Sequence, residues 1–600
     1  MATTWSLSFE KVEQANLAAA ELLRLCAFLA PDAIPEELIR DEVFFWSTPL
    51  KIASADSFTF NQMMEELLKF SLLERLAEAR LLSIHRLVQA VQKDRMEQNE
   101  QGRWAERVIR AVNHAFPDDP ESLEVWPQCR RYLDQTQICH ALIEEYQLPL
   151  VEGANLLDRT GIYLAEHALY TIAEPLHRRA LEIFEKQSGP EHPDTANSLH
   201  NLANLYQEQG KYAEADVLYQ SALQILEKQL GPDHSETAQL LNNLAALYWT
   251  QGQYVKAEPL YTRAIAIQER QLGPDHPRTV TSLNNLALLY QEQGKYTEAE
   301  RLYKRSLRIS EQQLGPDHPS TAASLNNLGT FYWTQGKNAK AKKLYTQALA
   351  IQERRLEPDH PSTAISLNNL AILYQEQEKY LEAEQFYKRA LAIREQRLGL
   401  ENPDTTESLN NLLELYQLQD MYVEAELLLL RTIKISEQQL GPDHIYTATT
   451  CSNLAELYQL QEKYPEAELL LQRVLEIDTK IYGENDPNVA ADQNSLAGLY
   501  KAQGRYKEAE MMYMQALRTC ALRLIPEHPD TGTVLDNLAS LYTIQERYVE
   551  AEPLYQRALI ICKQSLGWEH PTTQEVSQNY ATLLRRVGRD ADAEKLESEA

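Results

Sequence analysis

The side chains of this chain that most invite a chemical role are histidines spaced at a fixed interval. Eight of the fourteen histidines are separated by 42 residues or by a multiple of 42. Imidazoles are common metal ligands and acid–base groups. Packed helices lie about 8–10 Å apart, too far for neighbouring members to share a metal at bond lengths of about 2 Å. We therefore expect no metal site, and we predict turn and helix-start roles for His192, His234, His276, His318, His360, His444, His528 and His570.

Amide and aromatic side chains form a second series with the same spacing. The first residue of each Asn-Asn pair recurs at Asn242, Asn284, Asn326, Asn368 and Asn410. Seven residues after this register position, on the same face of a helix, stand Gln207, Trp249, Gln291, Trp333 and Gln375. An amide can donate and accept hydrogen bonds, so such a ladder can hold the backbone of an extended peptide. Tryptophans of this kind often dominate binding energy.

Catalytic chemistry has no comparable signal in the sequence. The phosphate-binding pattern G-x-x-x-x-G-K-[ST] does not occur. The six cysteines are scattered without a C-x-x-C pair, which favours ordinary buried thiols over zinc or disulfides. No nucleophile–base pair can be assigned. We expect a protein that is not an enzyme and has no cofactor.

A 42-residue repeat must position these series of residues. The core Asn-Leu-Ala-x-Leu-Tyr, exact or edited, occurs ten times without an inserted or deleted residue, at Asn201, Asn243, Asn285, Asn327, Asn369, Asn411, Asn453, Ser495, Asn537 and Asn579. A fixed period of this size indicates a solenoid, in which each unit buries its apolar face against its neighbours. The whole chain is also too long for a single compact core.

Each unit is predicted to be a helix–turn–helix. In one copy the first helix follows His276-Pro277 and runs to about Gln293. Gly294-Lys295 forms the turn, and the second helix covers about residues 296–313. Ten alanines, from Ala215 to Ala593 at 42-residue intervals, mark the contact between the two helices. A matching alanine in the first helix is replaced by Gly329 and Leu413, so local repacking is expected near Leu413.

These residues resemble the tetratricopeptide repeat. The pattern LNNLA…QGKYxEAExLYxRAL…LGPDHP is similar to the kinesin-light-chain variety, from Asp194 to the end of the chain. A degenerate unit at 157–186 and a polar last unit from Gln578 make about eleven repeats. The resemblance implies an all-α, right-handed superhelical solenoid whose first helices line the concave face. The Asn ladder would then lie in the groove, with Glu208, Glu292 and Glu376 suggesting a polar or basic partner.

An alternative reading of the ladder stays open at this point. The asparagines would then bond to adjacent repeats, and Trp249 and Trp333 would serve packing. An amide that faces the interior must find partners, and this favours the binding role for the ladder. For the two tryptophans the two readings weigh equally.

The first 150 residues follow a different pattern. Helical apolar spacing, a short hairpin and a further helix predict a winged-helix-like domain over residues 1–100. Two more helices, near 104–116 and 125–146, predict a helical connector over residues 101–150. The solenoid with its C-terminal cap would occupy residues 151–600. The helices of the first domain are expected near 22–29, 35–39, 63–70 and 85–96, with hairpin strands at 72–75 and 81–84.

The stretches TWSLSFEKV, LLRLCAFLAPDAIPEELI and SLLERLAEARLLSIHRLVQAV resemble the winged-helix part of bacterial NB-ARC proteins, which belong to the STAND class of signalling NTPases. Ile84-His85-Arg86 falls where that family carries Met-His-Asp, whose histidine contacts bound ADP. The resemblance implies a nucleotide-contacting role for His85 only if an NTPase domain accompanies this chain. Arg86 departs from the family's aspartate, and the NTPase domain is not in this sequence. Otherwise His85 is a packed histidine of its own domain.

Charge and hydropathy narrow the class of partner. The chain carries 58 basic and 87 acidic side chains, a net charge of −29. Residues 1–100 hold 10 Lys and Arg against 16 Asp and Glu, so a DNA-reading winged helix is rejected. No apolar run reaches the roughly 20 residues of a membrane span, and the N-terminus lacks a secretory signal. We expect a cytoplasmic protein that binds neither nucleic acid nor membrane.

Two functional hypotheses follow. The first is a non-catalytic module that recognises a protein or peptide in its concave groove, as the ligand-sensing and regulatory part of a STAND-type NTPase. The second is a free-standing scaffold that assembles protein complexes. Nucleotide binding by the native gene product would distinguish them. The identity of the ligand and the oligomeric state are not encoded in any recognisable pattern.

Overall fold

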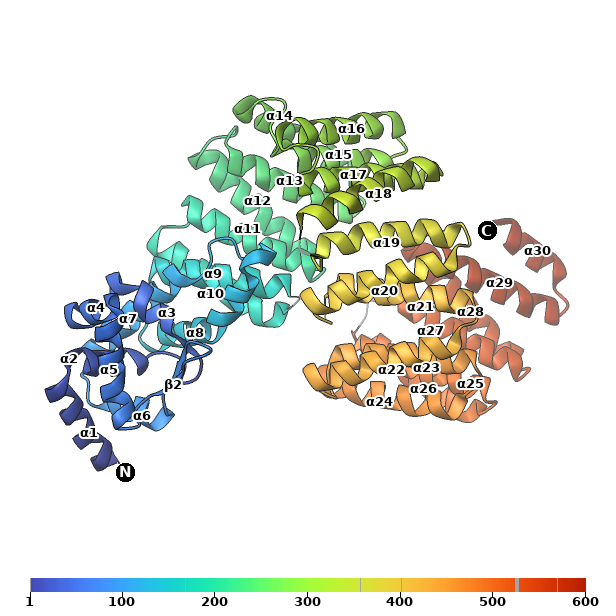
Figure 1. Ribbon diagram of the computed structural model, residues 1–600. Coiled ribbons are helices and arrows are strands. Elements are labelled where there is room, and N and C mark those ends of the chain that lie inside the picture. The colour runs from blue at the N-terminus through green and yellow to red at the C-terminus, as the bar shows by residue number, and fades with distance from the viewer. Residues whose placement is uncertain are drawn as a thin grey trace. The chain divides into compact units, whose positions relative to one another are not determined.

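The computed structural model describes residues 2–167, 169–356, 358–400, 402–523, 528–568 and 570–599. The chain divides into two compact units, Met1–Leu373 and Tyr374–Ala600. Nearly every element is a helix (Figure 1). The predicted all-α class is therefore confirmed.

The first unit begins with a small domain of short helices and a three-stranded sheet. Antiparallel strands in the order β1-β3-β2 form the sheet, with Ile34 paired to Leu82 and Arg75 paired to Leu82 from the other side. Its elements are α1 (Ala2–Ala15), α2 (Leu17–Cys26), β1 (Ile34–Pro35), α3 (Glu36–Asp41), η1 (Val43–Phe45), α4 (Thr48–Ala55), α5 (Ser57–Lys69), β2 (Glu74–Leu76), β3 (Leu81–Ser83) and α6 (Arg86–Asp94).

The expected hairpin is present as β2 and β3, and the four expected helices are present as α2, α3, α5 and α6, whereas α1, η1, α4 and β1 were not expected. Strand β1 has only two residues, too few for a period-2 pattern to be recognised. Its neighbour Glu36 is buried and paired with Arg75 of β2, so an ion pair joins helix α3 to the hairpin. Phe28, Phe60 and Leu82 are fully buried and centre the apolar core.

Two long helices follow, α7 (Gln98–Ala115) and α8 (Trp126–Glu145), with the short 3₁₀ turn η2 (Leu123–Val125) between them. Helix α8 is bonded back to the first domain. The backbone N–H of Ala30 donates to Gln135 Oε1 at 2.9 Å, and Arg131 Nη2 donates to Glu37 Oε2 at 3.0 Å. The two helices predicted for the connector are therefore present.

Repeated helix pairs fill the rest of the first unit. A Leu-Gly step at 230–231, 272–273 and 314–315 marks the end of the second helix in three of these repeats, and the next first helix begins a few residues after it. The pairs are α9 (Val151–Glu166) with α10 (Tyr170–Gln187), α11 (Pro193–Glu208) with α12 (Tyr212–Gln229), α13 (Ser235–Thr250) with α14 (Tyr254–Leu272), α15 (Thr279–Glu292) with α16 (Tyr296–Gln313), and α17 (Pro319–Thr334) with α18 (Asn338–Arg355). Helix α19 (Pro361–Glu376) contains the boundary between the units.

The second unit continues the same series. It contains α20 (Tyr380–Arg397), α21 (Pro403–Leu418), α22 (Tyr422–Gln439), α23 (Ile445–Leu460), α24 (Tyr464–Tyr482), α25 (Pro487–Ala502), α26 (Tyr506–Arg523), α27 (Pro529–Ile544), α28 (Tyr548–Ser565), α29 (Pro571–Arg586) and α30 (Asp590–Glu599). The predicted helix–turn–helix unit is confirmed, since the copy expected at about 278–293 and 296–313 is observed as α15 and α16.

The histidine column caps the first helices. The Nδ1 atom of His318 accepts the backbone N–H of Ser320 at 3.1 Å, and His192 accepts that of Asp194 at 3.2 Å. Where the register lacks histidine, Asn402 and Asp486 accept the equivalent N–H at 3.0 and 2.9 Å. The predicted helix-start role is confirmed, because histidine, asparagine and aspartate at this position all accept the same backbone N–H at the start of the helix.

The turn between the two helices requires a positive φ. Gly294 adopts φ 72° at no steric cost. In the second unit Glu378, Asp420, Glu462 and Glu546 hold the same register position with φ between 54° and 61°. A non-glycine residue in this region costs about 1–2 kcal/mol, so these turns are less favourable than the glycine turns.

The core of each repeat contains both small and large buried residues. On α16, for example, Ala299 is fully buried and Tyr303 is 5% exposed. At Gly329 an added Cβ would meet the Tyr345 ring at 2.5 Å, so this repeat needs glycine. The other exception, Leu413, is accommodated in a repeat that carries Leu429 where most others carry tyrosine. Both leucines are buried.

A hydrogen-bonded clamp joins successive repeats. Glu510 of α26 accepts the hydroxyl of Tyr542 at 2.8 Å and Nη1 of Arg547 at 3.0 Å, both from the next repeat. The bond from Arg547 holds the pKa of Glu510 below its usual value. In the first unit Glu258 binds the corresponding Tyr290 and Lys295 at 3.2 and 3.0 Å. The clamp fixes the angle between neighbouring repeats.

Candidate functional site

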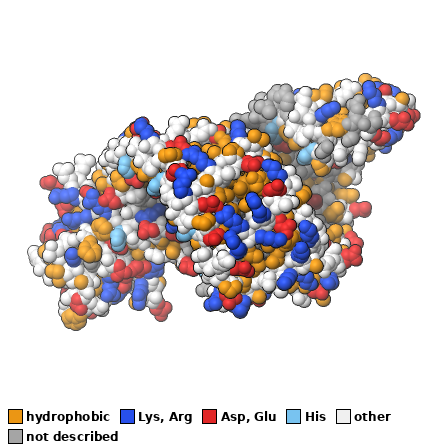
Figure 2. Space-filling model, turned by 90° about the horizontal axis from the view of Figure 1, so that it is seen from above, with side chains coloured by type: hydrophobic (Ala, Val, Ile, Leu, Met, Phe, Trp, Pro, Cys, Tyr) orange, Lys and Arg blue, Asp and Glu red, His pale blue; other side chains and the backbone are white. Residues whose placement is uncertain are grey.

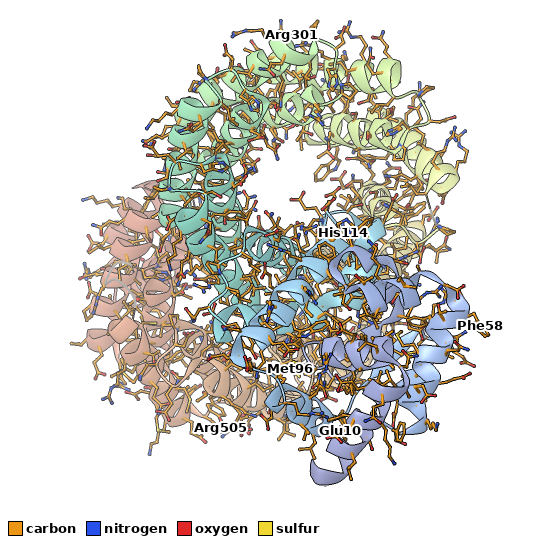
Figure 3. All side chains as sticks on the ribbon, turned by 90° about the vertical axis from the view of Figure 1, so that its left-hand side faces the viewer. Glu10, Phe58, Met96, His114, Arg301 and Arg505 are labelled. Carbon is orange, nitrogen blue, oxygen red and sulfur yellow. The ribbon has the colours of Figure 1, made fainter. Side chains whose placement is uncertain are left out.

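The first helices of the repeats form the inner side of the array. In the first unit α11 packs against α13, α13 against α15 and α15 against α17; in the second, α25 packs against α27 and α27 against α29. Elements on the inside of a curve lie closest together. Arg301, on the second helix α16, lies at the outer edge of the curved part of the first unit (Figure 3). We call the exposed side of the first helices the inner face.

The Asn ladder lies on successive first helices, but its members differ in environment. Asn242 accepts the side-chain amide of Asn285 from the next repeat at 3.4 Å. Asn284 is half-buried, and its Oδ1 is buried without a hydrogen-bond partner. Asn410, in the second unit, is exposed. Of these, Asn410 is the most accessible to a ligand.

Two ladder members are enclosed by the protein. Asn326 and Asn368 are only 5% and 3% exposed. The amide of Asn326 donates to Ser366 Oγ at 2.8 Å, and the same hydroxyl donates back to Asn326 Oδ1 at 3.1 Å. This bond joins one repeat to the next. A ligand cannot reach Asn326 without breaking this bond. Asn326 therefore has a structural function, and the binding role of the ladder as a whole stays a prediction.

The glutamines and tryptophans seven residues further on are all half-buried. Gln207 and Gln375 each accept a hydrogen bond from a buried tyrosine hydroxyl, at 3.2 and 3.1 Å. The indole Nε1 of Trp249 is buried and makes no hydrogen bond to another described residue. Trp333 and Gln291 lie at the same register position on α17 and α15. The bonds of Gln207 and Gln375 help to orient the second helix of their own repeats.

A further series of residues reaches the same face, and the sequence reasoning missed it. It lies between the ladder and the glutamine–tryptophan positions, and it is half-buried or exposed in every repeat. We call it the inner column: Asn204, Ala246, Leu288, Thr330, Ile372, Glu414, Glu456, Gly498, Ser540 and Thr582.

The inner column changes residue type at almost every repeat, whereas the packing alanine is constant in all ten copies. A repeat needs the alanine to fold, but the fold leaves the inner column free to differ. The signal was present in the sequence, because the column is the variable fourth position of Asn-Leu-Ala-x-Leu-Tyr. Repeat arrays use such surfaces to present a different contact at each step along a ligand.

Burial shifts the protonation of groups beneath the inner face. Burial lowers the pKa of His200 to about 4, so its neutral Nε2 accepts the amide of Asn243 at 2.7 Å. Burial raises the pKa of Asp536 to about 6. His200 and Asp536 both stand at the ladder position of their repeats. Elsewhere acidic and basic side chains are interspersed over the surface (Figure 2), which fits solvation of the outer faces.

His85 occupies a helix start in the first domain. It is exposed, and its Nδ1 accepts the backbone N–H of Leu87 at 3.2 Å as the N-cap of α6. Its neighbour Arg86 is exposed as well. Nothing in this geometry assigns a nucleotide, and the role implied for His85 stays a prediction.

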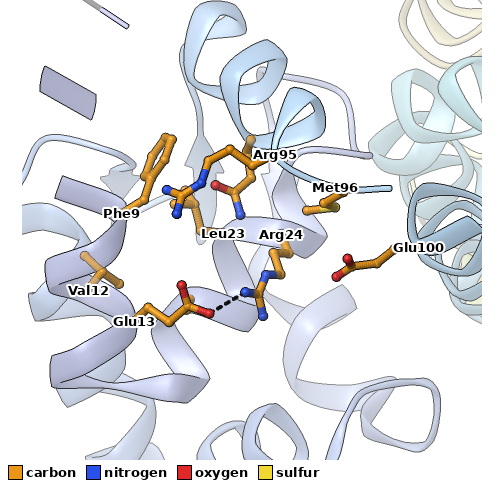
Figure 4. Close-up of a pocket in the computed structure, with 10 residues that line it drawn as sticks. Phe9, Val12, Glu13, Leu23, Arg24, Arg95, Met96 and Glu100 are labelled. Atoms are coloured by element: carbon orange, nitrogen blue, oxygen red, sulfur yellow. Dashed lines mark hydrogen bonds and ion pairs between the residues drawn. The ribbon is translucent and has the colours of Figure 1, made fainter. Parts of the chain in front are cut away.

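A small cavity lies beside helices α1, α2, α6 and α7. Its lining includes Phe9, Arg24, Gln92 and Arg95, and Arg24 is paired with Glu13 at 2.6 Å (Figure 4). Its volume is about 90 Å³. Pockets for small-molecule ligands usually measure about 300–1,000 Å³, so this cavity is too small for a nucleotide.

Among the described residues, no group of three or more His, Cys, Asp and Glu side chains is arranged to hold a metal ion. None of the described helices has the length and apolar character needed to cross a bilayer.

The repeated helix pairs of the structure and the match to a known family indicate the same class of protein, an array of tandem helical repeats. The tetratricopeptide-repeat family matches residues 161–521 and 524–600 in overlapping segments, so the chain belongs to that family. The predicted repeat fold is thereby confirmed. Residues 8–101 match a domain of unknown function, DUF7779.

Individual relatives cover between about a third and about three quarters of the chain. A nucleotide-binding leucine-rich repeat (NLR)-like protein of Hyaloscypha variabilis is 33% identical over 202 residues, which are 33% of this chain and 19% of that protein. A kinesin light chain of Podosopora anserina with nearly identical TPR-like repeats is 33% identical over 34% of this chain and 98% of its own, with a TM-score of 0.30. A STAND protein with a tetratricopeptide repeat sensor from Pyrococcus horikoshii is 16% identical over 78% of this chain and 64% of its own, with a TM-score of 0.44.

Proposed function

We propose that this chain is a non-catalytic recognition module whose inner face binds a protein or peptide segment. The observation that carries the proposal is the inner column, which reaches the surface in every repeat and changes residue type along the array. The family supports a protein-interaction role. An extended segment would pass from one first helix to the next and meet a different side chain at each.

Hydrogen-bonding capacity on the same face supports a polypeptide ligand. Trp249 Nε1 and Asn284 Oδ1 lie one repeat apart in the first unit, and neither has a hydrogen-bond partner among the described residues. One is a donor and the other an acceptor, which matches the N–H and C=O groups of a peptide backbone. Each would gain a bond that the free protein lacks.

We further propose that this chain is the ligand-sensing part of a STAND-type signalling NTPase, and that ligand binding to the array regulates the NTPase. The support is the identity with an NLR-like protein over a third of this chain, together with the sequence resemblance of the first domain to NB-ARC winged helices. The native gene product provides the test. Ligand binding to the array is expected to change its rate of ATP hydrolysis, whereas a native product that binds no nucleotide favours the free-standing scaffold.

The recognition step itself is tested with a displayed library of random peptides panned against the purified chain. Two variants of the inner face, Ala246→Arg and Gln291→Ala, are compared with two of the outer surface, Arg301→Glu and Lys343→Glu. We expect inner-face variants to weaken retained peptides by about tenfold or more, as loss of a central contact does, and outer variants to have no effect. Failure to retain any peptide, or sensitivity only to the outer variants, contradicts the proposal.

A further inference from the structure

One repeat of the second unit departs from the others at the centre of the inner face. In several repeats a buried tyrosine of the second helix donates its hydroxyl to the first helix, as Tyr219 does to Asn204 at 2.5 Å and Tyr345 does with Thr330 at 3.0 Å. Tyr513 holds this register position on α26 and is fully buried. Its hydroxyl has no hydrogen-bond partner among the described residues.

The missing partner is explained by glycine in the inner column. Gly498 stands where other repeats have Asn204, Leu288 or Thr330. A Cβ built on Gly498 would lie 3.8 Å from the Tyr513 hydroxyl oxygen, so the hydroxyl faces the space above the glycine. Glycine inside a helix costs about 1 kcal/mol relative to alanine. Glycine at position 498 leaves space beside the helix that a side chain occupies in the other repeats.

Polar groups of α25 and α27 frame that room. The amide of Asn537 donates to Asn494 Oδ1 at 3.0 Å on one side of Gly498, and Lys501 Nζ lies 3.5 Å from Ser540 Oγ on the other. These two bonds hold the helices in fixed register. We call this space, with Tyr513 and Asp536 at its edge, the Gly498 niche.

Asp536 supplies a second unpartnered group. It is 6% exposed, and while Oδ2 accepts the amide of Asn579 at 2.9 Å, Oδ1 is buried without a partner. Its charge acts on Tyr513, whose pKa is raised first by burial and then by this carboxylate. A buried polar atom without a bond carries a desolvation cost of about 1–3 kcal/mol. Asp536 is near enough for its charge to act on Tyr513, so these two unpartnered atoms lie in one region beneath the inner face.

The electrostatic surroundings favour a cation. Besides Asp536, the exposed Glu456 lies on α23, one repeat before Gly498, and the exposed Glu575 lies on α29, one repeat after Asp536. Lys501 is the basic residue of the set, and burial lowers its pKa. Three carboxylates against one amine give an acidic surface, which attracts a cationic ligand and repels an anionic one.

We infer that the Gly498 niche binds the cationic end of a lysine or arginine side chain from the bound polypeptide, with Asp536 and Tyr513 as its hydrogen-bond acceptors. The inference rests on the proposed recognition function and names its partner, a segment with a basic side chain. An ammonium or guanidinium group carries only hydrogen-bond donors. The unpartnered Asp536 Oδ1 is an acceptor and requires a donor of this kind. Gly498 provides the space through which the side chain enters.

The test uses the full chain at about 0.15 M salt, where long-range surface attraction is screened. Fluorescent peptides of equal length with the repeats Gly-Lys-Ser, Gly-Arg-Ser and Gly-norleucine-Ser are titrated by anisotropy. The variants are Gly498→Asn, which fills the niche without changing charge, and Asp536→Asn, which restores the residue of neighbouring ladder positions. Glu484→Gln, an exposed carboxylate between α24 and α25, is the control for net charge. Melting temperatures show that each variant folds.

We expect the lysine or the arginine peptide to bind and the norleucine peptide to fail. Gly498→Asn and Asp536→Asn should each weaken binding by about tenfold or more, and Glu484→Gln should not. If basic peptides bind equally well to Gly498→Asn, the niche is overturned while the recognition function stands. If none of the three peptides binds, the niche is overturned and the recognition function depends on its own library experiment. The relative affinity of the lysine and arginine peptides identifies which cation the niche takes.

Discussion

The hydroxyl of Tyr219 donates a hydrogen bond to Asn204 Oδ1 at 2.5 Å across the two helices of one repeat. The same pair of positions is occupied by Tyr513 and Gly498 in the second unit, where no such bond exists. One array thus contains both the closed and the open form of the same contact. The closed form stabilises a repeat, and the open form leaves a buried hydroxyl without a partner beneath the inner face.

This contrast predicts a measurable coupling between residues 498 and 513. Gly498→Asn should raise the free energy of unfolding, and part of that gain should disappear in a Tyr513→Phe background. The expected coupling is about 1 kcal/mol, the contribution of one buried hydrogen bond. Urea denaturation of the four proteins of the cycle measures it. A coupling of zero would show that the asparagine does not reach the hydroxyl.

The ladder position predicts opposite outcomes at two asparagines. Asn326→Ala removes the bond to Ser366 from a buried site and should cost about 1–3 kcal/mol of stability. Asn410→Ala changes an exposed residue and should stay within about 0.5 kcal/mol. Thermal melting followed by circular dichroism separates the two. Equal melting temperatures for both variants would contradict the structural role of Asn326.

The histidine caps predict a ranking of substitutions at residue 318. His318→Ala loses the acceptor for the Ser320 N–H and should cost about 1 kcal/mol. His318→Asn should be nearly neutral, because Asn402 performs the same function in this chain. The measurement is the urea midpoint of each variant. If the asparagine variant is as unstable as the alanine variant, packing of the imidazole rather than capping holds the helix start.

Sequence periodicity predicted the fold almost completely, for a reason visible in individual residues. Helix starts at His318, turns at Gly294 and contacts at Ala299 depend on residues within one repeat or the next. The alanine recurs in all ten copies, and most repeats supply the histidine and the glycine as well. The small sheet was incompletely predicted. Its strand β1 has two residues, and it forms only because Leu82, nearly fifty residues later in the chain, is available to pair with Ile34.

The candidate site could be predicted only in outline. The sequence placed Asn326 and Asn410 in one ladder, but burial separates them, and burial depends on Ser366 and other residues of the adjacent repeat. The inner column was visible as the variable position of the motif, yet its exposure was not. The open hydroxyl of Tyr513 required knowledge of a distance between two helices, which no spacing along the chain contains.

The turn residues predict a reciprocal pair of effects. Glu462 has φ 57°, and Gly504 occupies the next equivalent turn with φ 72°. Glu462→Gly should stabilise its repeat by about 1 kcal/mol, and Gly504→Glu should destabilise by a similar amount, because an L-residue pays a steric cost in this region. Melting temperatures of the two variants check the sign. Parallel shifts in one direction would contradict the argument.

Two carboxyl groups predict how the stability of the second unit depends on pH. Asp478 of α24 and Asp492 of α25 lie close enough that each influences the pKa of the other. Burial, followed by the charge of Asp478, raises the pKa of Asp492 to about 8. Burial, with a smaller contribution from the charge of Asp486, also raises the pKa of Asp478. An unfolded aspartate titrates near about 4. The folded protein therefore retains a proton that the unfolded chain releases.

The sign follows from that difference in bound protons. The stabilising contribution of this pair is complete below about pH 4, declines as the pH rises, and is lost above the raised pKa of about 8. Asp492→Ser, which introduces the residue found at Ser324, Ser366 and Ser408, should remove most of the decline and raise stability above about pH 8. Urea midpoints of both proteins between about pH 5 and pH 9 provide the measurement. A wild-type midpoint that increases across this range, or an unchanged slope in the variant, would show that the two carboxyls do not share a proton.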